Sequence, residues 1–192
     1  MTKDELRRRT LEALHGMSKD KRQGEEDVLF KGLLIYLDKH PCQRLAFYYG
    51  FEPEVDTATM MDHLLQEGIE IYLPRIQANR QMTFHRYLGR EDLEVVQQRI
   101  YQPPQEALQI EPEDIDLVIV PGLLWNSQGF RIGFGGGYYD RFLAKYSLPT
   151  LSLLFSCQFD GEGLWPVDSF DRAVDHLLIA SDQEVIIHES IV

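Results

Sequence analysis

Residues 116–141 read DLVIVPGLLWNSQGFRIGFGGGYYDR, an apolar run followed by a glycine-rich loop and the start of a predicted helix over 138–146. The run at 116–120 is typical of a strand that is buried on both faces of a parallel sheet. Gly133 and Gly135–Gly137 let successive backbone N–H groups point at one anion. The following helix adds the positive end of its dipole. We therefore expect an open α/β sheet with a phosphate site at the carboxyl end of this strand.

The segments on either side of this stretch alternate between predicted helices and strands. Apolar residues at helical spacing predict helices over 6–16, 28–37 and 57–66. Short runs rich in aromatic or β-branched residues predict strands over 44–49, 69–73, 81–87, 150–155 and 177–180. Residues 88–114 show little periodicity and are expected to be loop with a short helix. We expect one domain over residues 1–192, a single open, mostly parallel sheet with helices on both faces in a three-layer α/β/α arrangement.

The overall composition excludes several classes of protein. The 192 residues carry a net charge of −12, which argues against a general nucleic-acid or anionic-membrane binder. No apolar run approaches the ~20 residues that span a bilayer, and the first thirty residues lack the apolar stretch of a signal peptide. Cys42 and Cys157 lie too far apart in the sequence to suggest a zinc site or a disulfide framework. We expect a cytoplasmic monomer that binds neither nucleic acid nor membranes.

Positive charge is nevertheless concentrated at the N-terminus. Residues 1–22 hold seven basic residues against four acidic ones. This segment is either a solvated helical face or the cationic patch with which an acidic protein binds an anion. Lys3 and Arg7 are four residues apart and so share one helical face, whereas Arg8 points elsewhere.

The glycine-rich loop does not match the common phosphate-binding motifs. No lysine follows the glycines as a Walker loop requires, and Tyr138 stands where a dinucleotide-binding loop has its last glycine. A turn with only structural duties is the alternative. The neighbouring Arg131 offers bidentate donors to phosphate, and Asp140 is the kind of residue that holds Mg²⁺ beside a phosphate loop.

The segment GFRIGFGGGYYDRFL at 129–143 closely resembles the signature of the 5-formyltetrahydrofolate cyclo-ligase family, also called 5,10-methenyltetrahydrofolate synthetases. Further elements of that family resemble this chain in the same order, so that the resemblance covers nearly the whole chain. They are KDELR at 3–7, EVDT at 54–57, LP at 73–74, and WP at 165–166 followed by Asp171 and Asp175.

The resemblance implies ATP- and Mg²⁺-dependent closure of 5-formyltetrahydrofolate to 5,10-methenyltetrahydrofolate, with release of ADP and phosphate. The γ-phosphoryl group would move to the formyl oxygen, and N10 would then close the ring. Such a transfer needs alignment and charge neutralisation more than a protein nucleophile. A non-catalytic nucleotide- or folate-binding regulator on the same scaffold is the alternative. A nicotinamide dehydrogenase is disfavoured because its glycine pattern is absent.

The resemblance also assigns residues to each part of the reaction. Catalytic roles fall to Arg131 and Tyr138, and the metal ligands are Asp140 and Asp171. The nucleotide is expected to contact Lys3, Arg7, Arg131, Ile132, Gly133, Phe134, Gly135, Gly136, Gly137, Tyr138 and Tyr139. The folate substrate is expected to contact Tyr49, Glu54, Phe134, Gly135, Gly136, Gly137 and Tyr138. Departures from the family at Trp125, Asn126, Phe134 and Gly136 leave the shape of the folate pocket and any polyglutamate preference open.

Overall fold

The computed structural model describes residues 1–96, 100–163, 165–181 and 184–190. Its centre is an eight-stranded sheet in the order β12-β11-β10-β7-β1-β2-β3-β6. The strands are β1 (Arg44–Ala46), β2 (Glu70–Ile76), β3 (Met82–Tyr87), β6 (Gln109–Ile110), β7 (Leu117–Ile119), β10 (Thr150–Leu154), β11 (His176–Ser181) and β12 (Glu184–Glu189). The strands from β11 to β2 run parallel, and β12, β3 and β6 join them by antiparallel pairing.

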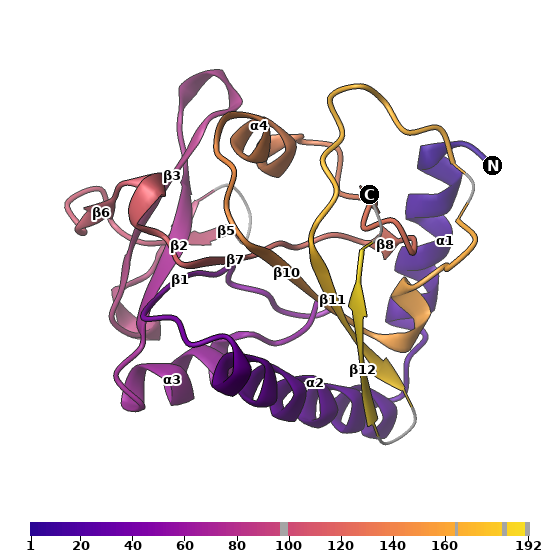
Figure 1. Ribbon diagram of the computed structural model, residues 1–192, viewed down its shortest axis with the longest axis horizontal. Helices are drawn as coiled ribbons and strands as arrows, with labels where there is room; N and C mark the ends of the chain where they lie inside the picture. The colour runs from indigo at the N-terminus through magenta and orange to yellow at the C-terminus, as the bar shows by residue number, and fades with distance from the viewer. Residues whose placement is uncertain (97–99, 164, 182–183, 191–192) are drawn as a thin grey trace.

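Helices cover both faces of the sheet (Figure 1). One face packs on α2 (Lys19–Lys39) and α3 (Ala58–Gln66), and the other on α4 (Tyr138–Lys145). The alternation of strand side chains divides the core accordingly, since Leu45 faces α2 and α3 while its neighbour Ala46 faces α4. The predicted open, mostly parallel sheet with helices on both faces is confirmed.

A further helix, α1 (Lys3–His15), packs against the small hairpin of β8 (Leu124–Trp125) and β9 (Arg131–Ile132). The N-terminus of α1 is closed by a capping box, in which Thr2 accepts from the Glu5 N–H and Glu5 accepts from the Thr2 N–H. Gly16 ends the helix, as predicted. The cap fixes where the helical face that carries the N-terminal cations begins.

The strand order reverses beside β1, and this reversal positions the site. From β1 the chain moves to β2 on one side and later returns to β7, which lies on the other side of β1. Ligands of open α/β sheets bind in the crevice at the carboxyl ends of the strands where such a reversal occurs. Because β1 and β7 are parallel neighbours, the segments 47–57 and 120–137 leave the same edge of the sheet side by side.

The second predicted helix is much longer than expected. It begins at Lys19, capped by Ser18, although its apolar stripe begins only near Val28. Its first turns are held by polar contacts instead, such as the Ser156 backbone N–H and hydroxyl donating to buried Glu25. Within the part of the chain that the structure describes, no helix is long and apolar enough to cross a membrane.

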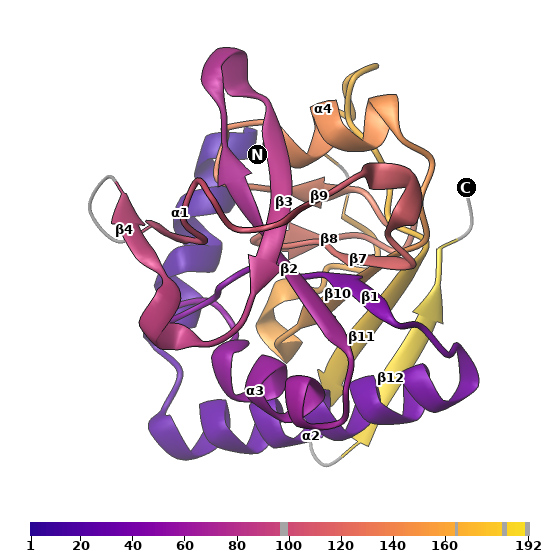
Figure 2. The same cartoon turned by 90° about the vertical axis from the view of Figure 1, so that its left-hand side faces the viewer.

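The prediction of loop with a short helix over 88–114 is only partly correct, because it omits three short strands. The segment contains β4 (Glu94–Val96), β5 (Ile100–Gln102), β6 and short 3₁₀ turns. These strands are too short and too exposed to show the alternation of apolar and polar residues that predicts a strand. The hairpin of β2 and β3 extends past the rest of the sheet, with β4 to one side (Figure 2). Pro74 lies inside β2 rather than at its end, at a point where β2 no longer pairs with β1.

Two glycines of α2 form a matched pair for testing its packing on β12. A methyl group added at Gly32 would lie 2.7 Å from the γ-carbons of Val185, whereas nothing lies within 4 Å of one added at Gly24. Gly24→Ala should raise the free energy of unfolding by about 0.5–1 kcal/mol, because alanine costs less backbone entropy in a helix. Gly32→Ala should lower it by about 1–3 kcal/mol through overpacking. Urea denaturation measures both, and equal gains would contradict this close packing.

Candidate functional site

The glycine-rich loop joins β9 to α4 at the carboxyl edge of the sheet. Gly135 has a φ of 96° and Gly137, the N-cap of α4, a φ of 66°, which is the left-handed region that side chains other than glycine rarely adopt. Phe134 is 58% exposed at the tip of the loop. In contrast, the side chain of Ile132 is buried in a cluster with Leu6, Leu124 and Trp165. The loop is therefore anchored at one end and open to a ligand at its tip.

Arg131 lies beneath this loop with its guanidinium almost fully buried. It donates to Asp140 Oδ1 (3.1 Å) in α4 and to the backbone oxygen of Arg172 (2.8 Å). Burial lowers the pKa of Arg131, and the negative charge of Asp140 opposes that shift. Asp140 Oδ1 also accepts the Arg172 N–H (3.1 Å), so the segment that carries Asp171 is tied to the first turn of α4.

Two cations of α1 reach the same region. Lys3 Nζ donates to Asp168 and to Asp171, at 2.7 Å each. Burial would lower the pKa of Lys3, but these two carboxylates raise it. Arg7 Nε donates to the Gly133 oxygen (2.8 Å), and the Arg7 guanidinium also contacts Asp4. The predicted shared face of Lys3 and Arg7 is present in the structure.

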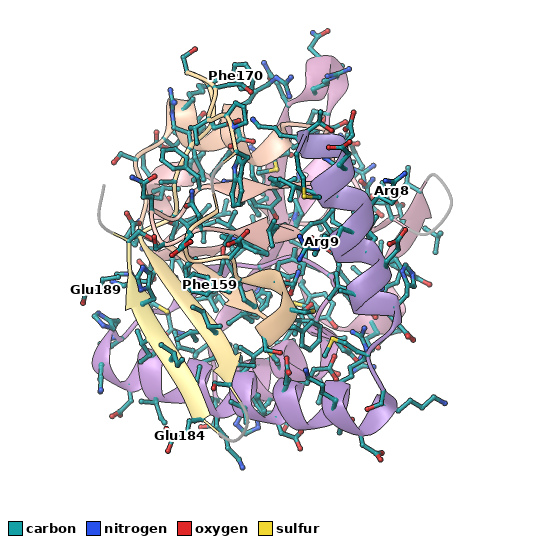
Figure 3. The ribbon with its side chains drawn as sticks, turned by 90° about the vertical axis from the view of Figure 1, so that its right-hand side faces the viewer. Arg8, Arg9, Phe159, Phe170, Glu184 and Glu189 are labelled. Atoms are coloured by element: carbon teal, nitrogen blue, oxygen red, sulfur yellow. The ribbon has the colours of Figure 1, made fainter. Side chains whose placement is uncertain are left out.

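The next two residues of α1 lie outside this arrangement. Arg8 and Arg9 are exposed and project from other sides of the helix (Figure 3). The N-terminal basic segment thus divides into residues that contact the glycine loop and the Asp171 segment, and residues that face solvent.

A cavity of about 260 Å³ follows β1. Tyr49 and Glu54, both predicted to bind the substrate, line it together with Glu26, Glu52 and Asp56. Burial raises the pKa of Glu54 to about 7. Two arginines, Arg22 and Arg90, also line the cavity. Because Arg90 is paired with Asp62 and Arg22 donates to backbone oxygens, the acidic side chains of the lining can offer hydrogen-bond acceptors to a ligand.

Tyr139, in the first turn of α4, directly follows the glycine loop. Its hydroxyl is buried and has no hydrogen-bond partner among the described residues. Burial raises the pKa of Tyr139, and the charge of nearby Glu54 raises it further. Burial and Glu54 act in the same way on the pKa of Tyr48. Tyr138, one residue earlier, instead lies against Gly136.

The structure adds residues that the sequence does not single out to the predicted segments. Tyr48, rather than Tyr49 alone, lies near Glu54, and Asp168 shares the Lys3 ammonium group with Asp171. Arg22 belongs to the basic segment 1–22 and also lines the Glu54 cavity. The sequence around Arg22 does not indicate this position, because its partners are backbone oxygens of distant residues.

Comparisons with known proteins agree with this architecture. The family model described as the 5-formyltetrahydrofolate cyclo-ligase family matches residues 1–180. A 5-formyltetrahydrofolate cyclo-ligase of Haemophilus influenzae is 27% identical over 79% of this chain and 86% of its own length.

Two solved structures are similar over nearly their full length. The 5,10-methenyltetrahydrofolate synthetase of Aquifex aeolicus has a TM-score of 0.83 and 27% identity, covering 98% of this chain and 93% of that one. The synthetase of Mycoplasma pneumoniae has a TM-score of 0.75 and 25% identity, covering 95% of this chain and 99% of that one. On the family match and these structures, the chain is an enzyme that belongs to the 5-formyltetrahydrofolate cyclo-ligase family.

Proposed function

We propose that this enzyme converts 5-formyltetrahydrofolate to 5,10-methenyltetrahydrofolate at the expense of ATP, in a reaction that requires Mg²⁺. The observation that carries the proposal is the position of the Glu54 cavity and the glycine-rich loop on segments that follow two adjacent parallel strands. A transfer between two bound substrates requires such neighbouring sites, because positioning supplies much of its rate.

The nucleotide phosphates fit the glycine-loop side. The loop N–H groups and the start of α4 favour an anion there, and Lys3, Arg7 and Arg131 supply positive charge. Each of these cations is paired with a carboxylate in this structure. A bound triphosphate would therefore share these three cations with Asp171, Asp4 and Asp140.

The donor set of Asp140 and Asp171 fits Mg²⁺. Asp140 uses Oδ1 and Asp171 uses Oδ2 in the hydrogen bonds described above, and no described residue donates to the second oxygen of either carboxylate. Magnesium typically takes one or two carboxylates together with phosphate oxygens and water. Bound there, it would neutralise charge on the phosphates.

The folate ring fits the Glu54 side. A carboxylate accepts two parallel N–H bonds from an amino-pyrimidinone, and Tyr49 offers an aromatic wall to the same cavity. Such donors favour the ionised form of Glu54, whose pKa burial has raised to about 7. Hydrogen bonds from the ligand would thus offset the free-energy cost of ionising the buried Glu54 carboxyl group.

The proposed reaction requires the two substrates to meet between the glycine loop and the Glu54 cavity. The γ-phosphoryl group passes to the formyl oxygen, which makes the formyl carbon electrophilic and gives it a good leaving group. N10 attacks that carbon, phosphate leaves with the oxygen, and N10 loses its proton. Arg131 and Tyr138 are the residues of the loop that we assign to charge stabilisation and orientation during the transfer.

The direct test is turnover followed by the near-ultraviolet absorbance of the conjugated product. Signal should require enzyme, ATP, Mg²⁺ and 5-formyltetrahydrofolate together.

Asp140→Asn should lose turnover by about 100-fold or more at every Mg²⁺ concentration while circular dichroism shows an intact fold. Wild-type turnover in this variant would remove Asp140 from the metal site. Binding of both ligands without any turnover would favour a non-catalytic regulator.

The proposed use of α1 predicts a difference between neighbouring cations. Lys3→Ala and Arg7→Ala should each raise the ATP KM by roughly tenfold, because a charge-assisted hydrogen bond is lost. Arg8→Ala should leave it unchanged, since Arg8 is exposed on another side of the helix. Steady-state kinetics with saturating folate would measure the three values. A similar increase in all three would indicate a general charge effect instead.

The cost of keeping Glu54 charged can be measured without ligands. Its pKa is raised on folding, so the folded state holds this proton more tightly and loses stability as the pH rises from about 4.5 to about 7. Glu54→Gln should match the wild type near pH 4.5 and exceed its free energy of unfolding by about 1–3 kcal/mol at pH 8. Denaturation of both proteins across this pH range measures the difference. A constant difference at all pH values would contradict the burial of Glu54.

A further inference from the structure

Arg22, near the start of α2, contacts three separate segments of the chain, one of which carries Glu54 and lines the cavity. One guanidinium nitrogen donates to the backbone oxygens of Pro53 (3.1 Å) and Glu54 (3.2 Å). The other donates to the oxygen of Leu14 (2.7 Å), in the last turn of α1. The guanidinium also lies over the ring of Phe155, 4.9 Å from its centroid.

A second residue of α2, one turn later, holds the other end of the same backbone segment. Glu26 Oε1 accepts the N–H of Asp56 at 3.1 Å. Arg22 and Glu26 are four residues apart and share one face of the helix. The backbone around Glu54 is thus held by a donor on its carbonyl side and by an acceptor on its N–H side.

In these contacts the charged guanidinium of Arg22 donates to backbone oxygens rather than to a carboxylate. No carboxylate lies within ion-pair distance of Arg22 among the described residues, and its donors are engaged with main-chain oxygens. A planar guanidinium donates from separate nitrogens held in one rigid plane, whereas an ammonium group donates from a single rotating nitrogen. Arg22 therefore has the geometry of a brace for the Glu54 segment rather than that of a ligand for an anion.

We propose that Arg22 is the positioning residue of Glu54, holding its backbone so that the carboxylate faces the cavity in the orientation that binds the folate ring. The inference rests on the proposed function, because it assigns Arg22 an effect on substrate binding that acts only through Glu54. Its effect on ATP should be small, since Lys3 and Arg7 lie at the other end of α1.

A double-mutant cycle separates positioning from a general structural role. The affinities of 5-formyltetrahydrofolate and of a non-hydrolysable ATP analogue would be measured by calorimetry for wild type, Arg22→Lys, Glu54→Gln and the double variant. Arg22→Lys should weaken folate binding roughly tenfold in the wild-type background and less than threefold in the Glu54→Gln background, because coupled residues are not additive. ATP-analogue affinity should change less than twofold. Lys31→Gln, an exposed cation of α2, is the matched control and should change neither.

The possible outcomes distinguish the two claims. An equal loss of folate affinity in both backgrounds would overturn the positioning role while leaving Glu54 as a ligand. Unchanged folate affinity in Glu54→Gln alone would overturn both the role of Glu54 and this inference. Thermal unfolding establishes that each variant is folded at the assay temperature. If Arg22→Lys is unfolded there, Arg22→Gln, which can still donate to one backbone oxygen, replaces it in the same cycle with the same expected coupling.

Discussion

The parallel pairing of β7 with β1 constrains the rest of the molecule. β7 is buried on both faces between β1 and β10, so its side chains must be apolar in both directions and its loops can emerge only at the two ends. Because the chain continues from β1 to β2 on one side and from β7 to β10 on the other, the segments at their carboxyl ends diverge. The segments 47–57 and 120–137, which carry Glu54 and the glycine loop, follow these two strands.

The cations around the site in this acidic protein have two kinds of partner. The cations near the glycine loop are paired with carboxylates, whereas the Arg22 guanidinium beside the Glu54 cavity donates to backbone oxygens. The first arrangement suits exchange, because a phosphate or a metal ion can replace one partner of an ion pair. The second suits rigidity, since main-chain oxygens offer no competing charge and stay where the fold places them.

Sequence reasoning succeeded where a local pattern directly reflects the fold. The run at 116–120 indicated burial on both faces, and the spacing of Lys3 and Arg7 indicated a shared helical face, and both are present in the structure. It failed where an element depends on distant partners. The exposed edge strand β12 is recognisable only through its pairing with β11, and the early start of α2 only through contacts such as that of Glu25 with Ser156. The proximity of Glu54 to Tyr139 also has no trace in either segment, because it arises from the neighbouring positions of β1 and β7.

The small cluster of Leu6, Leu124, Ile132 and Trp165 beneath the glycine loop has a spectroscopic consequence. The chain has two tryptophans, and both lie on the side of the sheet that carries β8 and β9. Trp125 packs in the core beside α4, and Trp165 packs between α1 and the root of the loop. The face covered by α2 and α3 has no indole of its own. Tryptophan emission from this enzyme consequently reports on the packing of α1 and the hairpin, and is nearly blind to events confined to the opposite layer.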